Sequence, residues 1–325
     1  MSVVLIHVLS GYLDEGLFAD HTAVMFSVNN ILYTYAMPLF FMLSGLLFHM
    51  SRSAREDPET VGKKHIEGIG NFAVVYFAYS IIYALLKILL SGYVYAGVTF
   101  TDLALIWACP IGPYWYLYVL TGFYIIFGFK RIRSLPPKVM IIVLAAISAA
   151  VSFMPQIYWF RLDRLAYYAL FFYLGMQLNS VLMDRMLSIR WIPAAFAAVS
   201  AALAVLFRGN GYLSTVPVVN VALGISVSLL VICLFRRFKL IRQSGTLVFC
   251  GKHTLEIYLL HAFAVAACRT VLPKAGITNV WVNILISFIC GLLIPLLISL
   301  AAEKLGIHKL LFKPWSFFAD RNHRL

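Results

Sequence analysis

The residues best suited to chemistry in this chain are ionisable side chains that lie inside apolar stretches. One such stretch runs from residue 251 to residue 261 and contains Lys252, His253, Glu256 and His261. A charged residue at the centre of a membrane-spanning helix costs roughly 2.5 to 3.5 kcal/mol. These side chains must therefore be paired, kept neutral or used by the protein.

His7 is a second histidine in an apolar segment. By helical rise, His7 and His261 both lie ~8 to 11 Å from the same membrane boundary. An imidazole with a pKa near neutrality is the usual acceptor of a hydroxyl proton, so either histidine could be a general base. The alternative is a buried histidine that is hydrogen-bonded to a neighbouring carbonyl.

Glu256 follows Lys252 by four residues and His253 by three, so these side chains share one helix face. His261 is turned ~140° away from Glu256. The Glu256 group is either a structural pair that joins helices or part of a pocket near a ligand that enters from the cytoplasm.

Further candidates lie near the segment ends. Arg161 and Arg164 could bind an anionic acceptor or a pyrophosphate, or pair with Asp163 on the surface. Trp115 belongs to an aromatic cluster that is either an interfacial belt or a stacking surface for a sugar. Lys63 and Lys64 could hold the phosphates of a nucleotide-like donor, or serve only to orient the chain in the membrane.

The composition indicates the kind of fold that holds these residues in place. The 325 residues are 62% hydrophobic and 12% charged, and the mean hydropathy is +0.89, which is far more apolar than a soluble domain. We therefore expect one all-α membrane domain, a bundle of about ten helices with an incomplete first helix, followed by a cytoplasmic tail at 303–325. The expected spans after the first segment are 30–50, 69–90, 113–129, 138–154, 166–183, 190–207, 216–235, 246–268 and 279–302.

The net charge of +13 has a topological explanation, because most Lys and Arg residues fall in alternate loops. This bias places those loops and both termini in the cytoplasm, and no nucleic-acid partner is expected. The five cysteines have no metal-ligand or disulfide spacing. No phosphate-binding loop is found, and we expect no metal cofactor.

The first apolar segment is about a dozen residues long, or ~18 Å of helix, which is too short to span a bilayer. It also lacks the basic leading region of a signal peptide. We therefore expect that residues preceding Met1 belong to this helix in the complete protein.

Four motifs occur together in one order along the chain. They are Met37 to Gly45 (MPLFFMLSG), Gly112 to Leu117 (GPYWYL), Phe171 to Gly175 (FFYLG) and Gly251 to His261 (GKHTLEIYLLH). With His7, this set resembles the membrane-bound acyltransferase 3 family, and most closely its fucose 4-O-acetylase type. The similarity runs from His7 to about Arg269.

The resemblance implies a ten-helix enzyme of the bacterial inner membrane that transfers an acyl group, usually acetyl from cytoplasmic acetyl-CoA, to a hydroxyl of an envelope or exported glycan. It implies that His7 is the catalytic residue. The family's arginine about ten residues before this histidine would precede Met1, in agreement with the expected missing residues. His261 and Glu256 would shape the cavity.

Two other functions fit the same residues. A secondary transporter also has polar residues and a proline-broken helix at membrane depth, although the two related halves that such proteins often show are not found here. An inactive relative of the acyltransferases would follow from the short first helix.

Overall fold

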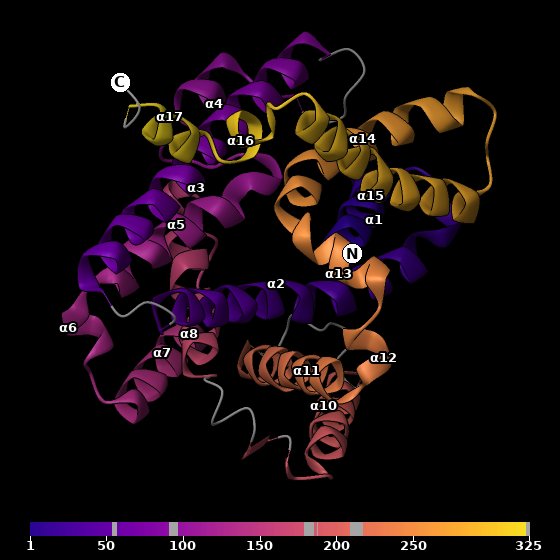
Figure 1. Ribbon diagram of the computed structural model, residues 1–325. Coiled ribbons are helices and arrows are strands. Elements are labelled where there is room, and N and C mark those ends of the chain that lie inside the picture. Colours follow the sequence, from indigo (N-terminus) through magenta and orange to yellow (C-terminus); the bar gives the residue numbers. More distant parts are fainter. Residues whose placement is uncertain (54–56, 91–96, 179–184, 187, 209–216, 323–325) are drawn as a thin grey trace. The chain divides into compact units, whose positions relative to one another are not determined.

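The computed structural model describes residues 1–53, 57–90, 97–178, 185–186, 188–208 and 217–322, and every regular element in these ranges is a helix (Figure 1). The α-helices are α1 (Ser2–Asp14), α2 (Thr22–Ser53), α3 (Pro58–Leu89), α4 (Phe100–Ala104), α5 (Trp115–Gly128), α6 (Lys130–Arg133), α7 (Pro137–Val151), α8 (Leu162–Gln177), α10 (Ile192–Arg208), α11 (Pro217–Arg237), α12 (Lys239–Arg242), α13 (Gly245–Lys252), α14 (Thr254–Lys274), α15 (Val280–Lys304), α16 (His308–Phe312) and α17 (Pro314–Asn322). Short 3-10 turns lie at Ala19–His21, Gly112–Tyr114 and Trp159–Arg161.

Five of these helices are long and apolar enough to cross a membrane. They are Thr22–Arg52, Glu59–Leu89, Val218–Arg237, Thr254–Lys274 and Val280–Lys304. Each reaches the roughly 20 residues that about 30 Å of hydrocarbon requires. The predicted class, an all-α bundle of membrane helices, is confirmed.

The other predicted spans form shorter helices. The helices α5, α7, α8 and α10 have 14, 15, 16 and 17 residues. Turn geometry limits two of them: Gly112 before α5 has φ of +58°, and Phe160 and Arg161 before α8 have φ of 53° and 47°. A backbone with positive φ cannot continue an α-helix, so these turns set where the two helices begin. The helix α5 begins two residues after the predicted start at residue 113, and α8 begins four residues before the predicted start at residue 166. Residues 179–183 of the predicted sixth span lie outside the described residues.

The predicted span 246–268 is divided in two. The chain leaves helical geometry at His253, between α13 and α14. The Thr254 hydroxyl donates to the Gly251 carbonyl at 2.8 Å, which satisfies one carbonyl at the end of α13. Lys252 and His253 therefore precede the span, whereas the sequence pattern placed them inside it.

The chain divides into two compact units. The first contains residues 1–32, 67–118 and 249–325, and the second contains residues 33–66 and 119–248. The helices α2, α3, α5 and α13 each contribute residues to both. The two units are described separately below.

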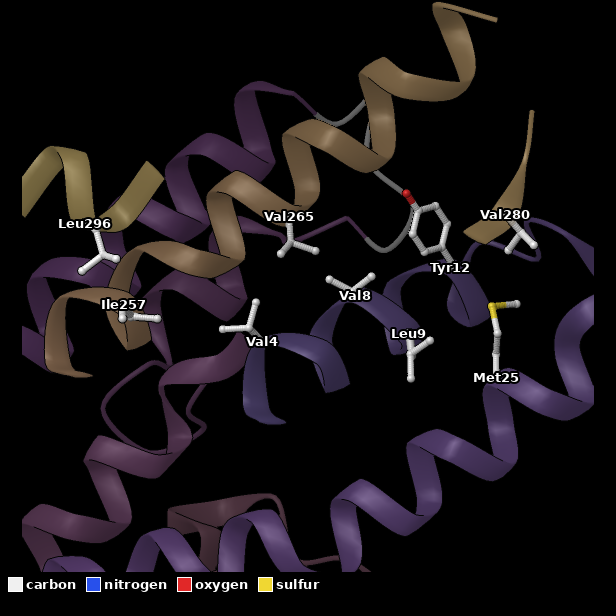
Figure 2. Close-up of a cluster of buried hydrophobic side chains, with 9 residues drawn as sticks. All are labelled: Val4, Val8, Leu9, Tyr12, Met25, Ile257, Val265, Val280 and Leu296. Carbon is white, nitrogen blue, oxygen red and sulfur yellow. The ribbon is translucent and has the colours of Figure 1, made fainter. Parts of the chain in front are cut away.

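The core of the first unit lies where α1 packs against the antiparallel pair α14 and α15 (Figure 1). Figure 2 shows its buried side chains converging from these three helices and from the start of α2. Two close contacts fix α1 on α15: the Tyr12 and Ser287 hydroxyls are 3.0 Å apart, and Gly291 leaves room for Val4. The cluster consists of Val4, Val8, Leu9, Tyr12, Met25, Ile257, Val265, Val280 and Leu296.

In the second unit, α2 and α8 cross with their backbones in close contact. A Cβ atom at Gly45 would overlap the carbonyl of Phe172, and a Cβ atom at Gly175 would overlap the carbonyl of Met42. Small residues at such crossings allow membrane helices to gain van der Waals contact along their backbones. Two of the sequence motifs thus meet at a packing site.

Pro38 lies inside α2, which continues through it from Thr22 to Ser53. A proline removes the hydrogen bond to the carbonyl four residues earlier, here that of Thr34. A Cβ atom at Gly224 of α11 would lie 3.2 Å from that carbonyl oxygen and 3.1 Å from the Pro38 ring. Gly224 therefore lets α11 approach α2 at the proline.

The C-terminal segment folds back on α3 within the first unit. The Asn71 amide donates to the Ser316 hydroxyl at 2.6 Å, and this hydroxyl lies 2.5 Å from a carboxylate oxygen of Glu67. The Trp315 ring fills the space that a side chain at Gly70 would need. The residues expected to form a tail thus include two packed helices, α16 and α17.

We predict that Asn71→Ala loosens this segment. The substitution removes two hydrogen bonds: the one that Asn71 donates to the Ser316 hydroxyl, and the one that Asn71 Oδ1 accepts from the Ser316 backbone N–H at 3.2 Å. Hydrogen bonds of this kind are worth about 1 kcal/mol each. Hydrogen exchange of residues 314–319 should become faster by roughly fivefold per bond lost. Asn220→Ala in α11 is the control, and unchanged exchange in Asn71→Ala would contradict the prediction.

Candidate active site

A cavity of about 540 Å³ opens in the first unit between α1, α3 and α14. The turn before α5 closes one side with Gly112 and Pro113. Ionisable side chains of all three helices line it: His7, Asp14, Glu15, Lys87 and Arg269. A cavity of this volume with a few convergent polar groups is typical of a small-molecule site.

One face of α1 supplies the polar side of this cavity. His7, Ser10, Gly11 and Asp14 line it, and their spacing of three, four and seven residues keeps them on the same face of a helix. The opposite face, with Val8 and Tyr12, is buried in the core shown in Figure 2. The apolar face of α1 therefore holds His7 against the cavity.

His7 contacts His261 of α14. Their ring centroids are 5.0 Å apart and the rings are inclined by 51°. The sequence placed both histidines at one depth, and the structure brings them into contact. Within the part of the chain that the structure describes, neither ring nitrogen of His7 has a hydrogen-bond partner, so a substrate hydroxyl can bind there.

His261 is fully buried, and its Nδ1 lies 3.0 Å from the carbonyl oxygen of Ile257 and 2.7 Å from that of Tyr258. Because a carbonyl only accepts hydrogen bonds, Nδ1 carries the proton and Nε2 of the neutral ring is an acceptor. Nε2 is buried and has no hydrogen-bond partner among the described residues. His261 thus presents a fixed tautomer beside His7, although it does not line the cavity itself.

Arg269 and Glu15 form an ion pair on the cavity wall. Arg269 Nε lies 2.8 Å from Glu15 Oε1, and both side chains are more than four-fifths buried. The contact is an ion pair by distance, without the alignment of a hydrogen bond at Nε. A Cβ atom at Gly11 would overlap Nη1 of Arg269, so glycine lets the guanidinium group lie on the backbone of α1.

Glu256 contacts a different part of the protein than His261 does. Its Oε1 lies 2.9 Å from Nε2 of His308 in α16 and 3.9 Å from Nδ1 of His253. The Lys252 side chain is exposed and is not among these partners. Glu256 therefore joins α14 to the C-terminal segment, and its predicted role in substrate binding stays a prediction.

Trp115 is half-buried at the first residue of α5 and does not line the cavity. The residues around it hold the closing turn in place: the Tyr114 hydroxyl donates to the Leu259 carbonyl at 3.0 Å, and the Tyr258 hydroxyl donates to the Pro113 carbonyl at 2.5 Å. The sugar-stacking role of Trp115 stays a prediction.

Arg161 and Arg164 lie in the second unit, at the start of α8. Arg164 Nε is 3.5 Å from a carboxylate oxygen of Asp163, and the Arg161 guanidinium lies over the Tyr158 ring at 5.0 Å from its centroid. Asp163 is only 8% exposed, so the expected ion pair is present and is largely buried. Neither arginine lines the cavity that contains His7, and anion binding by them stays a prediction.

Lys63 and Lys64 are exposed in the first turns of α3, and Lys63 pairs with Glu59 at 2.6 Å. Near them in the second unit is a cavity of about 300 Å³ with two arginines, Arg52 and Arg133, in its wall. Arg52 Nη1 and Arg133 Nε are buried and have no hydrogen-bond partner within the described ranges. Two cationic groups without an acidic lining residue form a potential anion site.

Four residues of the cavity wall were not predicted from the sequence to belong to a site: Gly11, Glu15, Lys87 and Arg269. The spacing of His7, Ser10, Gly11 and Asp14 was readable as a polar helix face. Glu15 and Arg269 lie far apart along the chain, so no local sequence pattern indicates that they form an ion pair. Arg52 has no distinguishing local pattern either, and it is one of the many Lys and Arg residues whose bias indicates membrane orientation.

Comparison with protein-family models finds one described as an acyltransferase domain, and it matches residues 1–300. A search of curated proteins and a search of solved structures each found no match. The matched residues include α1 with His7 and most of α14 and α15, which form the walls and core around the cavity. The chain belongs to the membrane-bound acyltransferase 3 family.

Proposed function

We propose that this membrane acyltransferase moves an acyl group, usually acetyl, from cytoplasmic acyl-CoA to a hydroxyl of a cell-envelope or exported glycan. The observation that carries the proposal is His7 in the wall of a polar cavity of about 540 Å³, with ring nitrogens that no described protein group occupies. The protein would lie in a bacterial inner membrane with both termini in the cytoplasm.

In this reaction His7 removes the proton from the acceptor hydroxyl. The hydroxyl oxygen then forms a bond to the thioester carbonyl carbon, the carbon–sulfur bond breaks, and the proton passes from His7 to the departing thiolate. His261 contacts His7 from the buried side and orients its ring. Arg269, Glu15 and Asp14 offer donors and acceptors suited to sugar hydroxyls.

The second cavity offers a place for the acidic donor. Arg52 and Arg133 could bind the phosphates of CoA, because guanidinium groups match phosphate geometry bidentately. Lys63 and Lys64, which are exposed and follow the lining residue Val61 in the sequence, could add positive charge near this cavity.

Membrane vesicles that expose the cytoplasmic face, supplied with radiolabelled acetyl-CoA, test the proposal. After the reaction the glycan is extracted from the vesicles. Glycan from vesicles that contain the protein should carry the label as an alkali-labile ester, and glycan from vesicles without the protein should not. Protein-dependent movement of a labelled solute across the membrane without consumption of acetyl-CoA would instead support a transporter.

We predict that Arg52→Gln raises the KM for acyl-CoA by roughly tenfold or more, because a hydrogen bond to a charged group contributes about 1.5 to 3 kcal/mol. The measurement is the dependence of the initial transfer rate on acyl-CoA concentration. Arg131→Gln, which removes the same charge from an exposed position of α6, is the control and should change KM less than about twofold. Lys63→Gln in the same assay tests the surface lysine, and an equal effect of Lys63→Gln and Arg52→Gln would contradict a specific role of the cavity.

A further inference from the structure

Two histidines and two glutamates meet where α14, α15 and α16 come together in the first unit. His253 immediately precedes α14, Glu256 lies in its first turn, Glu303 lies near the end of α15, and His308 begins α16. One possible ligand atom from each of His253, Glu303 and His308 lies within 4.8 Å of the other two. Glu256 Oε1 lies near both histidines, 2.9 Å from His308 Nε2 and 3.9 Å from His253 Nδ1.

The burial of this cluster requires compensation of its charge. His253 is 8% exposed and Glu256 is 6% exposed. Glu256 Oε2 is buried and has no hydrogen-bond partner in the part of the chain that the structure describes. A buried carboxylate oxygen without a partner is unfavourable, and buried charges in proteins are paired or coordinate metals.

A protonated His308 accounts for only part of this arrangement. It would pair with Glu256 Oε1, but Oε2 would still lack a partner. Glu303 Oε1 is 3.9 Å from His308 Nε2, which is too long for a hydrogen bond. A cation bound by His253, Glu303 and His308 would lie next to Glu256, which is close to both histidines, and would compensate its charge.

We propose that His253, Glu256, Glu303 and His308 bind a divalent transition-metal ion that ties α16 to α14 and α15. Imidazole nitrogens and carboxylate oxygens are ligands of Zn²⁺, Fe²⁺ and Mn²⁺, and four of them complete a tetrahedral zinc site. The sequence showed no metal motif because Glu303 and His308 lie about fifty residues from His253. Only the fold brings them together.

The candidate ligand atoms must move slightly closer together to bind one ion. Metal–ligand distances of about 2.0 to 2.2 Å place tetrahedral ligand atoms roughly 3.3 Å apart, which is closer than the widest separation here. Glu303 and His308 can supply the movement, because their side chains are 47% and 21% exposed. The buried pair His253 and Glu256 needs a smaller movement, because His253 Nδ1 and Glu256 Oε1 are already 3.9 Å apart. Lys252 and Lys304 adjoin the cluster in sequence, but both are exposed, so water and salt screen their repulsion of the ion.

The test uses the whole chain in detergent, purified with a tag that contains no histidine and treated with a chelator. Zn²⁺ is then titrated, and the bound metal is measured by elemental analysis after removal of free ions. We expect one Zn²⁺ per chain. The variants His308→Asn and Glu303→Gln should each weaken binding at least about tenfold, because each removes one direct ligand. The matched controls His21→Asn and Glu59→Gln should bind as the parent does.

Unfolding temperatures separate loss of metal binding from loss of the fold. The unfolding temperatures of parent and variants are compared in chelator, where equal values show that the variants are folded. Zn²⁺ should raise the unfolding temperature of the parent and of the controls only. Absence of stoichiometric Zn²⁺ from the parent, or equal binding by the parent and by the folded His308→Asn and Glu303→Gln variants, would overturn the site. These readouts do not involve acyl transfer, so they are independent of the proposed function.

Discussion

His7→Ala is expected to lower acyl transfer by about 10²-fold to 10⁴-fold, which is the usual contribution of a general base. His7 lies on the polar face of α1, and its ring contacts His261 at a centroid distance of 5.0 Å. Alanine removes the imidazole of His7 from the cavity wall, and none of the other described lining residues carries an imidazole that could replace it. The measurement is the initial rate of label transfer from acetyl-CoA to glycan.

The matched control is His21→Ala. His21 ends the short turn before α2 and packs against Trp281 with 5.6 Å between ring centroids, and it does not line the cavity. Both variants should reach the membrane in amounts equal to the parent. His7→Gln, which preserves more of the side-chain volume, separates loss of the base from a packing defect. If His7→Gln and His7→Ala each kept most of the parent rate at equal protein amounts, the role of His7 would be wrong.

The largest expected effect on stability is at the crossing of α2 and α8. Gly175→Val would place side-chain carbon against the backbone carbonyl of Met42, and Gly45→Val would do the same at Phe172. The backbone cannot move aside without separating the helices. We therefore expect the free energy of unfolding to fall by about 3 kcal/mol, near the upper end of the costs of overpacking. Such a loss is a large part of a typical unfolding free energy of about 5 to 15 kcal/mol.

Denaturant or thermal unfolding in detergent measures this effect. Gly62→Val in α3 is the matched control, because it introduces the same side chain into a helix where a Cβ atom at Gly62 would meet no heavy atom within 4 Å. Its stability should change by less than about 0.5 kcal/mol, since the helix propensities of glycine and valine are similar. Equal stabilities of Gly175→Val and Gly62→Val would show that α2 and α8 are not packed as closely as described.

The approximate positions of the helices were predictable because hydrophobic length and turn residues are local properties. The predicted spans 30–50, 69–90 and 279–302 fall within or within one residue of α2, α3 and α15. The boundaries at α8 and α14 were not predictable. They depend on a left-handed backbone at Arg161 and on a break at His253, which an apolar pattern cannot show.

The candidate site was predictable only in part. The equal depth of His7 and His261 follows from helical rise along two segments, and their contact in the structure agrees with it. The wall of the cavity includes small residues of α14, such as Ala262 and Ala266. Whether a small residue leaves space or is covered by a neighbour depends on three-dimensional packing.

The residues from 251 to 261 show the same division between local and tertiary information. The spacing of Glu256 and His261 is enough to place them on different sides of one helix, because each residue adds 100° of rotation. Their partners, His308 for Glu256 and His7 for His261, follow from the folded structure alone. These partners lie far away along the chain, and a contact at such separation is created by helix packing, which no local pattern of residues encodes.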